Sequence, residues 1–135
     1  MNDKKINRYV LLDLGMVFDS TADALTKYGY LPGTMGYYSP EQFDLSRKSD
    51  LDFRSDMFCL GIVLYQVITG EHPFIKNGDN QDDVFKRILN QTPEPITNYR
   101  SDISLNFEKI IFRLLKKRPS ERFRNMKVFR QFLER

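Results

Sequence analysis

The sequence of 135 residues carries 41% hydrophobic and 29% charged side chains, which is typical of one soluble globular domain. Its single cysteine, Cys59, excludes an internal disulfide and fits the reducing cytoplasm. The short apolar stretch near the N-terminus is interrupted by Asp13, which argues against a signal peptide or a membrane anchor. The net charge is +3, and residues 100–135 hold 11 Lys/Arg against 4 Asp/Glu. Because these basic residues alternate with apolar ones at helical spacing, we expect amphipathic helices there and no nucleic-acid binding.

The first predicted element is a strand that ends at an acidic residue. The segment 9–12 is short, apolar and partly β-branched, and Asp13, Leu14 and Gly15 follow it directly. Residues 16–32 show no sustained periodicity and contain glycine, proline and several polar side chains, so we expect a loop.

A segment rich in glycine, proline and tyrosine follows the loop. Residues 33–41 read GTMGYYSPE, and Pro40 should begin a short helix that ends at Phe43. Residues 44–54 are mostly polar and should connect this turn to the next helix.

The longest apolar run of the chain predicts a central helix around which the others pack. Between residues 57 and 68 only Gln66 is frankly polar, and the run is shorter than the roughly 20 apolar residues that span a bilayer. A helix that is apolar on nearly every side is buried on nearly every side. We predict this helix over residues 55–69, with Ser55 as its N-cap and Asp56 buried in its first turn.

The rest of the chain predicts a turn and three amphipathic helices. Residues 69–74, TGEHPF, should end the central helix and return Phe74 to the core, with His72 as a loop residue. Helices are expected over 82–91, 104–117 and 125–134, each with apolar residues on one face. The last two should be capped by a serine at 104 and an asparagine at 125, with Arg122 in the linker between them.

Five of these features occur in the order found in protein kinases, and the chain resembles the C-terminal lobe of that family from about Tyr9 onwards. The features are D-L-G at 13–15, G-T-x-x-Y-x-S-P-E at 33–41, S-D-x-x-x-L-G at 55–61, T-G-x-x-P-F at 69–74 and the arginine of L-L-x-x-x-P-x-x-R at 122. Leu14 stands where the family usually has phenylalanine, and Ser39 where it usually has alanine.

The resemblance implies a mainly α fold. We expect a truncated kinase-like C-lobe built around a buried central helix, with a short N-terminal strand, in one domain that covers residues 1–135. Within it, residues 13–41 would form the activation segment. Thr34 favours the serine/threonine type over the tyrosine type.

The resemblance also implies roles for individual residues. Asp13 would be the magnesium ligand, in keeping with the preference of Mg²⁺ for oxygen ligands. Gly33 and Thr34 would contact the protein substrate. Val63 and Val67, four residues apart on one face of the central helix, would lie beneath the adenine of ATP.

Three further residues would have structural roles. Asp56 would anchor the backbone of the catalytic loop. Glu41 and Arg122 would form a partly buried ion pair, since guanidinium is a bidentate donor that stays ionised when it is buried.

The 135 residues contain no Gly-rich loop, no phosphate-pairing lysine with a partner glutamate and no H-R-D-x-x-x-x-N catalytic loop. We therefore expect the C-terminal part of a serine/threonine kinase that does not catalyse by itself and binds neither ATP nor magnesium alone. The alternatives are a non-catalytic lobe mimic or pseudokinase module that regulates a kinase or its substrate, and a gene remnant.

Association with protein is expected because the family helix that packs on one side of the central helix is absent from these 135 residues. The apolar central helix should have one face without its usual cover, with Leu64 and Ile68 as candidates for the exposed side chains. A second copy, the other part of a kinase, or a kinase or its substrate would bind there. No membrane partner is expected, and the cytoplasm is the expected location.

Overall fold

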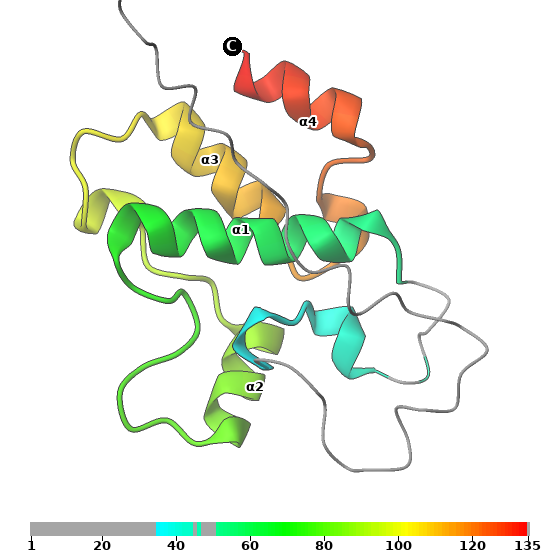
Figure 1. Cartoon of the computed structure of the whole chain (residues 1–135), viewed down its shortest axis with the longest axis vertical. Helices are drawn as coiled ribbons and strands as arrows, with labels where there is room; N and C mark the ends of the chain where they lie inside the picture. Colours follow the sequence, from blue (N-terminus) through cyan, green and yellow to red (C-terminus); the bar gives the residue numbers. More distant parts are fainter. Residues whose placement is uncertain (1–34, 45, 47–50, 135) are drawn as a thin grey trace, which may run out of the picture. The chain divides into compact units, whose positions relative to one another are not determined.

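The computed structural model describes residues 35–44, 46 and 51–134. The described elements all belong to one unit, Leu31–Arg135, built around helix α1 (Phe53–Thr69) (Figure 1). Helix α1 begins two residues before the predicted start, because the Asp52 side chain accepts a hydrogen bond from the Arg54 N–H and serves as the N-cap. It ends where Gly70 adopts the left-handed conformation with φ of 78°.

Helix α1 is buried on one side and open on the other, which agrees with the expectation that one face lacks its cover. The fully buried side consists of Met57, Phe58, Gly61, Ile62 and Tyr65. On the opposite side Val63 is 44% exposed and Val67 is 76% exposed.

The structure differs from expectation at three side chains of helix α1. Leu64 and Ile68, the expected exposed pair, are half-buried against the core. Asp56 is exposed rather than buried, because it lies on the open side together with Val63 and Val67. A uniformly apolar helix carries little information about which side faces the core, and only its neighbours decide that.

Short 3₁₀ helices precede helix α1 in the described part of the chain. They are η2 (Met35–Tyr37) and η3 (Pro40–Phe43), and the second has the range predicted for the short helix. Pro40 begins η3, where its missing N–H costs nothing.

Three α-helices follow helix α1. They are α2 (Gln81–Asn90), α3 (Leu105–Leu114) and α4 (Met126–Leu133), with the short 3₁₀ helices η5 (Ile96–Asn98) and η6 (Pro119–Glu121) in the connections. Ser104 and Asn125 accept backbone N–H groups as the N-caps of α3 and α4, as predicted. Helix α3 ends at Leu114, three residues before the expected end, and residues 115–117 continue as a turn.

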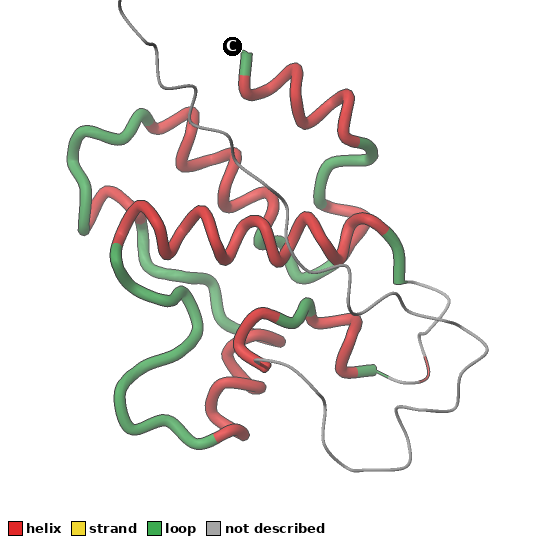
Figure 2. The backbone as a smooth tube through the Cα atoms, viewed as in Figure 1, coloured by secondary structure: helices red, strands yellow, loops and turns green. Residues whose placement is uncertain are grey.

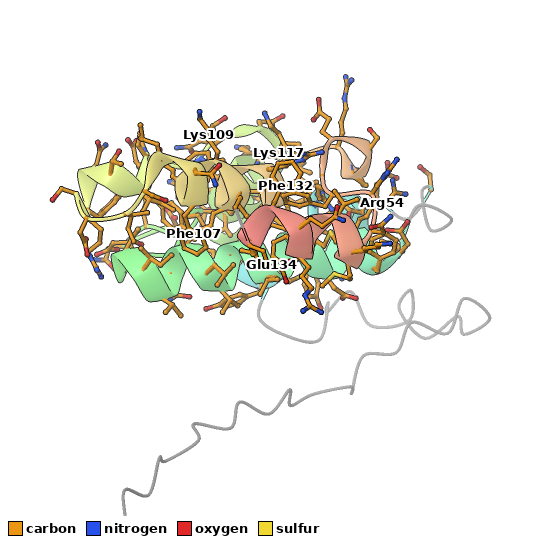
Figure 3. All side chains as sticks on the ribbon, turned by 90° about the horizontal axis from the view of Figure 1, so that it is seen from above. Arg54, Phe107, Lys109, Lys117, Phe132 and Glu134 are labelled. Atoms are coloured by element: carbon orange, nitrogen blue, oxygen red, sulfur yellow. The ribbon has the colours of Figure 1, made fainter. Side chains whose placement is uncertain are left out.

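Helix α1 packs against helix α3 through two clusters of buried apolar side chains. The larger cluster holds Phe58, Ile62, Tyr65 and Phe74 together with aliphatic side chains from α2, η5, α3 and the C-cap of α3, namely Val84, Ile88, Ile96, Ile111 and Leu115. The second lies between α1, α3 and α4 and holds Met57, Ile110, Leu114, Phe123 and Phe129. Phe107 of α3 and Phe132 of α4, labelled in Figure 3, are half-buried against it.

All regular structure in the described residues is helical, which confirms the mainly α fold (Figure 2). The strand predicted over residues 9–12 lies outside the described residues. Among the residues that are described, we find no helix with the length and apolar character needed to cross a bilayer.

Candidate functional site

A buried ion pair joins the end of the 13–41 segment to the linker before helix α4. Arg122 Nη1 lies 2.6 Å from Glu41 Oε1, and Arg122 Nη2 lies 2.8 Å from Glu41 Oε2. The exposed fractions of the two side chains are 0% and 1%. This is a bidentate pair, the strongest arrangement of an arginine with a carboxylate, across 81 positions of sequence.

The remaining donors of Arg122 bind backbone carbonyls. Nε donates to Lys116 O at 2.8 Å, Nη1 to Arg54 O at 2.7 Å and Nη2 to Lys117 O at 3.2 Å. All five N–H groups of the guanidinium are therefore used, and its carbon lies 4.8 Å from the centre of the Phe58 ring. Arg122 thus ties together η3, the start of α1 and the end of α3.

Glu41 receives a further hydrogen bond from helix α1. Ser55 Oγ, which is buried, donates to Glu41 Oε1 at 2.8 Å. Burial by itself raises the pKa of Glu41, but the hydrogen bonds and charge of Arg122, with the hydroxyl of Ser55, outweigh it and hold the pKa below its usual value. Sequence reasoning placed Ser55 at the helix N-cap and missed this role. Ser55 is the third residue of helix α1, and no local sequence signal indicates its bond to Glu41.

The serine that replaces the usual alanine before Pro40 is fully buried and satisfied locally. The Ser39 N–H donates to Gln42 Oε1 at 2.8 Å and the Ser39 hydroxyl donates to the same oxygen at 2.9 Å. A buried hydroxyl without a partner would destabilise the turn, and Gln42 removes that cost. The departure from the family pattern at residue 39 is therefore compatible with the buried turn.

The preceding residues are held against helix α1 by Tyr37. Its hydroxyl donates to Gln66 Oε1 at 2.6 Å, and its carbonyl accepts from Cys59 Sγ at 2.9 Å. Burial, with smaller contributions from the charges of Asp56 and Glu41, raises the pKa of Cys59 to about 11. Cys59 is therefore a protonated thiol at neutral pH, consistent with its interpretation as a packing residue.

The loop after helix α1 contacts the same segment through His72. Its Nδ1 accepts the N–H groups of Phe74 and Ile75, both at 3.1 Å, and its ring meets Tyr37 edge to face at 5.1 Å. Burial lowers the pKa of His72 to about 4, so the ring is neutral at pH 7. His72 is thus a structural support between two loops, a role that the sequence did not reveal.

Gly36 lies where the loop after helix α1 approaches residues 35–37. A Cβ atom at Gly36 would lie 2.4 Å from Ile75 Cδ1 and 3.3 Å from His72 Nε2. The absence of a side chain therefore permits the close approach of the two loops.

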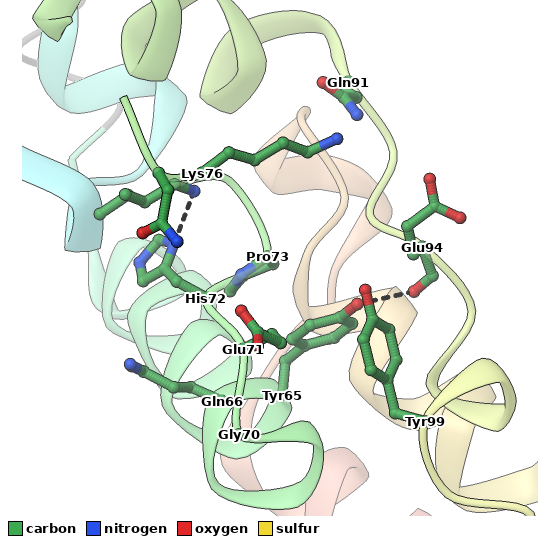
Figure 4. A pocket seen from close by; sticks show the side chains of 12 residues that line it. Tyr65, Gln66, Gly70, Glu71, His72, Pro73, Lys76, Gln91, Glu94 and Tyr99 are labelled. Carbon is green, nitrogen blue, oxygen red and sulfur yellow. Dashed lines mark hydrogen bonds between the residues drawn. The ribbon is translucent and has the colours of Figure 1, made fainter. Parts of the chain in front are cut away.

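A pocket of about 420 Å³ lies beside this contact, at the C-terminal end of helix α1 (Figure 4). Gln66, Glu71 and His72 contribute to one wall, and Glu94 and Tyr99 to the other. The wall that contains Glu94 is held to helix α1 by the Tyr65 hydroxyl, which donates to Glu94 O at 3.0 Å. Most of the side chains that line the pocket are polar.

The other residues singled out from the sequence have different outcomes. Asp13, Gly33 and Thr34 lie outside the described residues. Val63 and Val67 are solvent-exposed on helix α1, and Asp56 is exposed in its first turn. The structure thus brings Glu41 and Arg122 together, while the magnesium, substrate and adenine assignments remain predictions.

Comparison with known proteins gives consistent matches along nearly the whole chain. The protein kinase domain family model matches residues 2–133. The serine/threonine-protein kinase pkn3 of Myxococcus xanthus is 39% identical over 130 residues, which cover 92% of this chain and 23% of the relative.

The serine/threonine-protein kinases PknB of Mycolicibacterium smegmatis and Mycobacterium leprae are 32% and 33% identical. Those matches cover 97% and 96% of this chain and 20% of each relative, so the chain spans about a fifth of the length of the curated relatives it matches. Together with the order of its motifs and a helical fold built on α1, these matches establish that the chain belongs to the protein kinase family, is of the serine/threonine type and corresponds to its C-terminal lobe.

Proposed function

We propose that this chain serves as the C-terminal part of a serine/threonine kinase domain, which transfers phosphate from ATP to protein hydroxyls. We further propose that these 135 residues do not catalyse the reaction without the segments that carry a Gly-rich loop, a phosphate-pairing lysine and a catalytic base. The observation that carries the proposal is the bidentate, fully buried pair of Glu41 and Arg122.

That ion pair supports a role in positioning the substrate segment. A buried pair of this kind contributes little net stability compared with apolar side chains, so its presence calls for another explanation. Here it fixes η3, which begins six residues after Thr34, the second of the two residues proposed to receive substrate. Positioning of the reactants accounts for much of the rate of phosphoryl transfer, because the protein itself forms few covalent bonds during the reaction.

The kinase family uses ATP and magnesium, and Asp13 is the residue of this chain proposed to hold the metal. Mg²⁺ is commonly bound by one or two carboxylates together with substrate phosphates, so Asp13 would hold the metal only together with ATP and the other part of the kinase domain. The metal would neutralise the charge that develops on the phosphates.

A chimera tests the kinase proposal. Residues 2–133 would replace the matching segment of the Myxococcus relative, and transfer of labelled phosphate to a protein substrate would be measured. We expect activity in the chimera, loss of at least a hundredfold in its Asp13→Ala variant, and no transfer above background by the 135-residue chain alone.

The Asp19→Ala variant of the chimera provides the matched control, because it removes a nearby aspartate that has no proposed role. A folded but inactive chimera would overturn the proposal. So would transfer by the isolated chain that disappears in its own Asp13→Ala variant.

The exposed side of helix α1 supports the proposal that this chain binds another protein. Val63 and Val67 form an apolar stripe, continued by the half-buried Leu60, and large exposed apolar areas usually mark interfaces. We propose that the other part of a kinase domain covers this stripe in the cytoplasm, and that a second copy of the chain does so when that part is absent. Neither nucleic acid nor a membrane is a proposed partner.

The same stripe favours a second candidate function, a non-catalytic module that binds a kinase or its substrate. The two functions differ in the chimera experiment, because a dedicated binding module would fold in the chimera without supporting phosphoryl transfer.

Charged substitutions test the stripe. Sedimentation of the isolated chain over a range of concentrations should show association, and Val63→Glu or Val67→Glu should shift the chain to monomer, because each places a carboxylate in the proposed interface. Leu105→Glu is the control, since Leu105 is 65% exposed on helix α3. A wild-type chain that stays monomeric and binds no apolar-surface dye would contradict this proposal.

A further inference from the structure

Two carboxylates line the pocket at the C-terminal end of helix α1 (Figure 4), and they come from different loops. Glu71 follows Gly70, the C-cap of the helix, and Glu94 lies just before η5. Both glutamates are exposed, and neither carboxylate forms an ion pair with a residue that the structure describes. The pocket therefore presents two negative charges to a positively charged ligand.

Hydrogen bonds to helix α1 fix the backbone of both glutamates. The Thr69 hydroxyl donates to Tyr65 O at 2.9 Å and accepts the N–H of Glu71 at 3.1 Å. The Tyr65 hydroxyl donates to Glu94 O at 3.0 Å. Both glutamates are thus attached to the last turns of one helix, and this prior placement lowers the ordering cost of binding a ligand.

An aromatic surface belongs to the same pocket. Tyr99 is 44% exposed, and its ring centre lies 6.4 Å from that of Tyr65, with the two ring planes at 74° (Figure 4). Tyr65 is 1% exposed, so it gives Tyr99 a fixed neighbour. The exposed face of a tyrosine ring attracts cations, and the planar guanidinium group stacks on such a face more often than an ammonium group does.

The other titratable groups in the lining leave the pocket acidic at pH 7. Lys76 is exposed and contributes one ammonium group. His72 contributes no charge, because burial lowers its pKa to about 4. Among the described lining residues, two carboxylates thus outweigh one ammonium, and the volume of about 420 Å³ lies in the range of pockets that bind small organic groups.

We propose that this pocket binds a guanidinium group, carried either by a small free compound or by an arginine side chain of a protein. The planar cation stacks on Tyr99 and donates hydrogen bonds to Glu71 or Glu94, because its donors form a rigid fork that matches a carboxylate. Gln66, which also lines the pocket, accepts the Tyr37 hydroxyl at 2.6 Å, so a bound group lies close to that contact. Binding of this kind needs neither ATP nor phosphoryl transfer, so it can be tested separately from kinase activity.

The experiment titrates the whole chain at low ionic strength and without ATP, and follows its backbone amides by two-dimensional NMR. The probes are propylguanidine and a capped Gly-Arg-Gly peptide, and both should give saturable shifts of the amides near Glu71 and Glu94. The same peptide with citrulline in place of arginine keeps the shape and removes the charge, so it should bind about tenfold more weakly. A lysine peptide should bind about threefold more weakly than the arginine peptide, because an ammonium group lacks the planar fork.

Charge substitutions locate the binding site. Glu71→Gln and Glu94→Gln should each weaken binding about threefold, because each removes one partner of an exposed ion pair. Lys76→Gln should strengthen binding about twofold, since it removes the competing ammonium group. Glu121→Gln is the control, because Glu121 is exposed but does not line this pocket.

Substitutions of Tyr99 separate stacking from charge. Tyr99→Leu should weaken binding about threefold, whereas Tyr99→Phe should keep the affinity of wild type because the ring remains. Unchanged amide signals away from the pocket verify that each variant is folded.

Absence of saturable binding, or equal binding of the arginine and citrulline peptides, would contradict the guanidinium site. So would an unchanged affinity in a folded Glu71→Gln/Glu94→Gln double variant. Tighter binding of the peptide than of propylguanidine would assign the group to a protein, and equal binding would assign it to a free compound. An inactive chimera would count only against the kinase proposal, because these titrations involve no catalysis.

Discussion

Replacing either partner of the Glu41–Arg122 pair should destabilise the chain by roughly 3–5 kcal/mol, because the remaining charge is left buried without compensation. We expect this for Glu41→Leu and for Arg122→Met in urea unfolding. The double substitution should cost less than the sum of the two single ones, because it removes both charges. It also frees the carbonyls of Arg54, Lys116 and Lys117, so some loss should remain.

The exposed pair of Arg100 and Asp102 is the matched control for this set of single and double substitutions. Its side chains are 48% and 66% exposed, and its atoms lie 2.7 Å apart, close to the spacing of the buried pair. Exposed pairs contribute roughly 0–1 kcal/mol. The coupling free energy from the two single and the double substitutions should be larger for Glu41 and Arg122 than for Arg100 and Asp102. If it were not larger, the structural role assigned to the buried ion pair would be wrong.

A second large effect is expected at Gly61, in the middle of helix α1. A Cβ atom there would lie 2.9 Å from Leu114 Cβ and 2.9 Å from Leu115 Cδ2. Leu114 Cβ is attached to the backbone of helix α3, so it cannot move away by rotating a side chain. We expect Gly61→Val to cost about 1–3 kcal/mol through overpacking, measured by thermal or urea unfolding.

Gly61→Ala gives the sharper comparison, because helix propensity predicts the opposite sign. Alanine is favoured over glycine by about 1 kcal/mol in a helix interior. We expect the close contact with helix α3 to outweigh that gain and to make the variant less stable than wild type. Gly70→Ala is the control, since its cost comes from a positive φ with no atom within 4 Å of the added Cβ. An increase in stability for Gly61→Ala would show that the close contact between α1 and α3 can relax at little cost, and it would contradict this prediction.

The helices, several of their ends and the family can be inferred from the sequence alone. Periodic apolar residues locate α2, α3 and α4 because an amphipathic helix must direct one face to the core. Ser104, Asn125 and Gly70 mark helix ends because their local backbone geometry depends on few neighbours. The pairing of Glu41 with Arg122 was available only through the resemblance to kinases, since nothing in their spacing links them.

The side of helix α1 that is buried, and the residues that support the Glu41–Arg122 pair, become clear only from the packed structure. The expectation for Leu64 and Ile68 failed because a helix that is apolar all round lacks a periodic signal, so its orientation depends on where α3 packs. Ser55 has the character of an ordinary polar residue in the sequence. Its burial and its hydrogen bond to Glu41 depend on a segment 14 positions earlier in the chain, and packing of this kind leaves no local trace in the sequence.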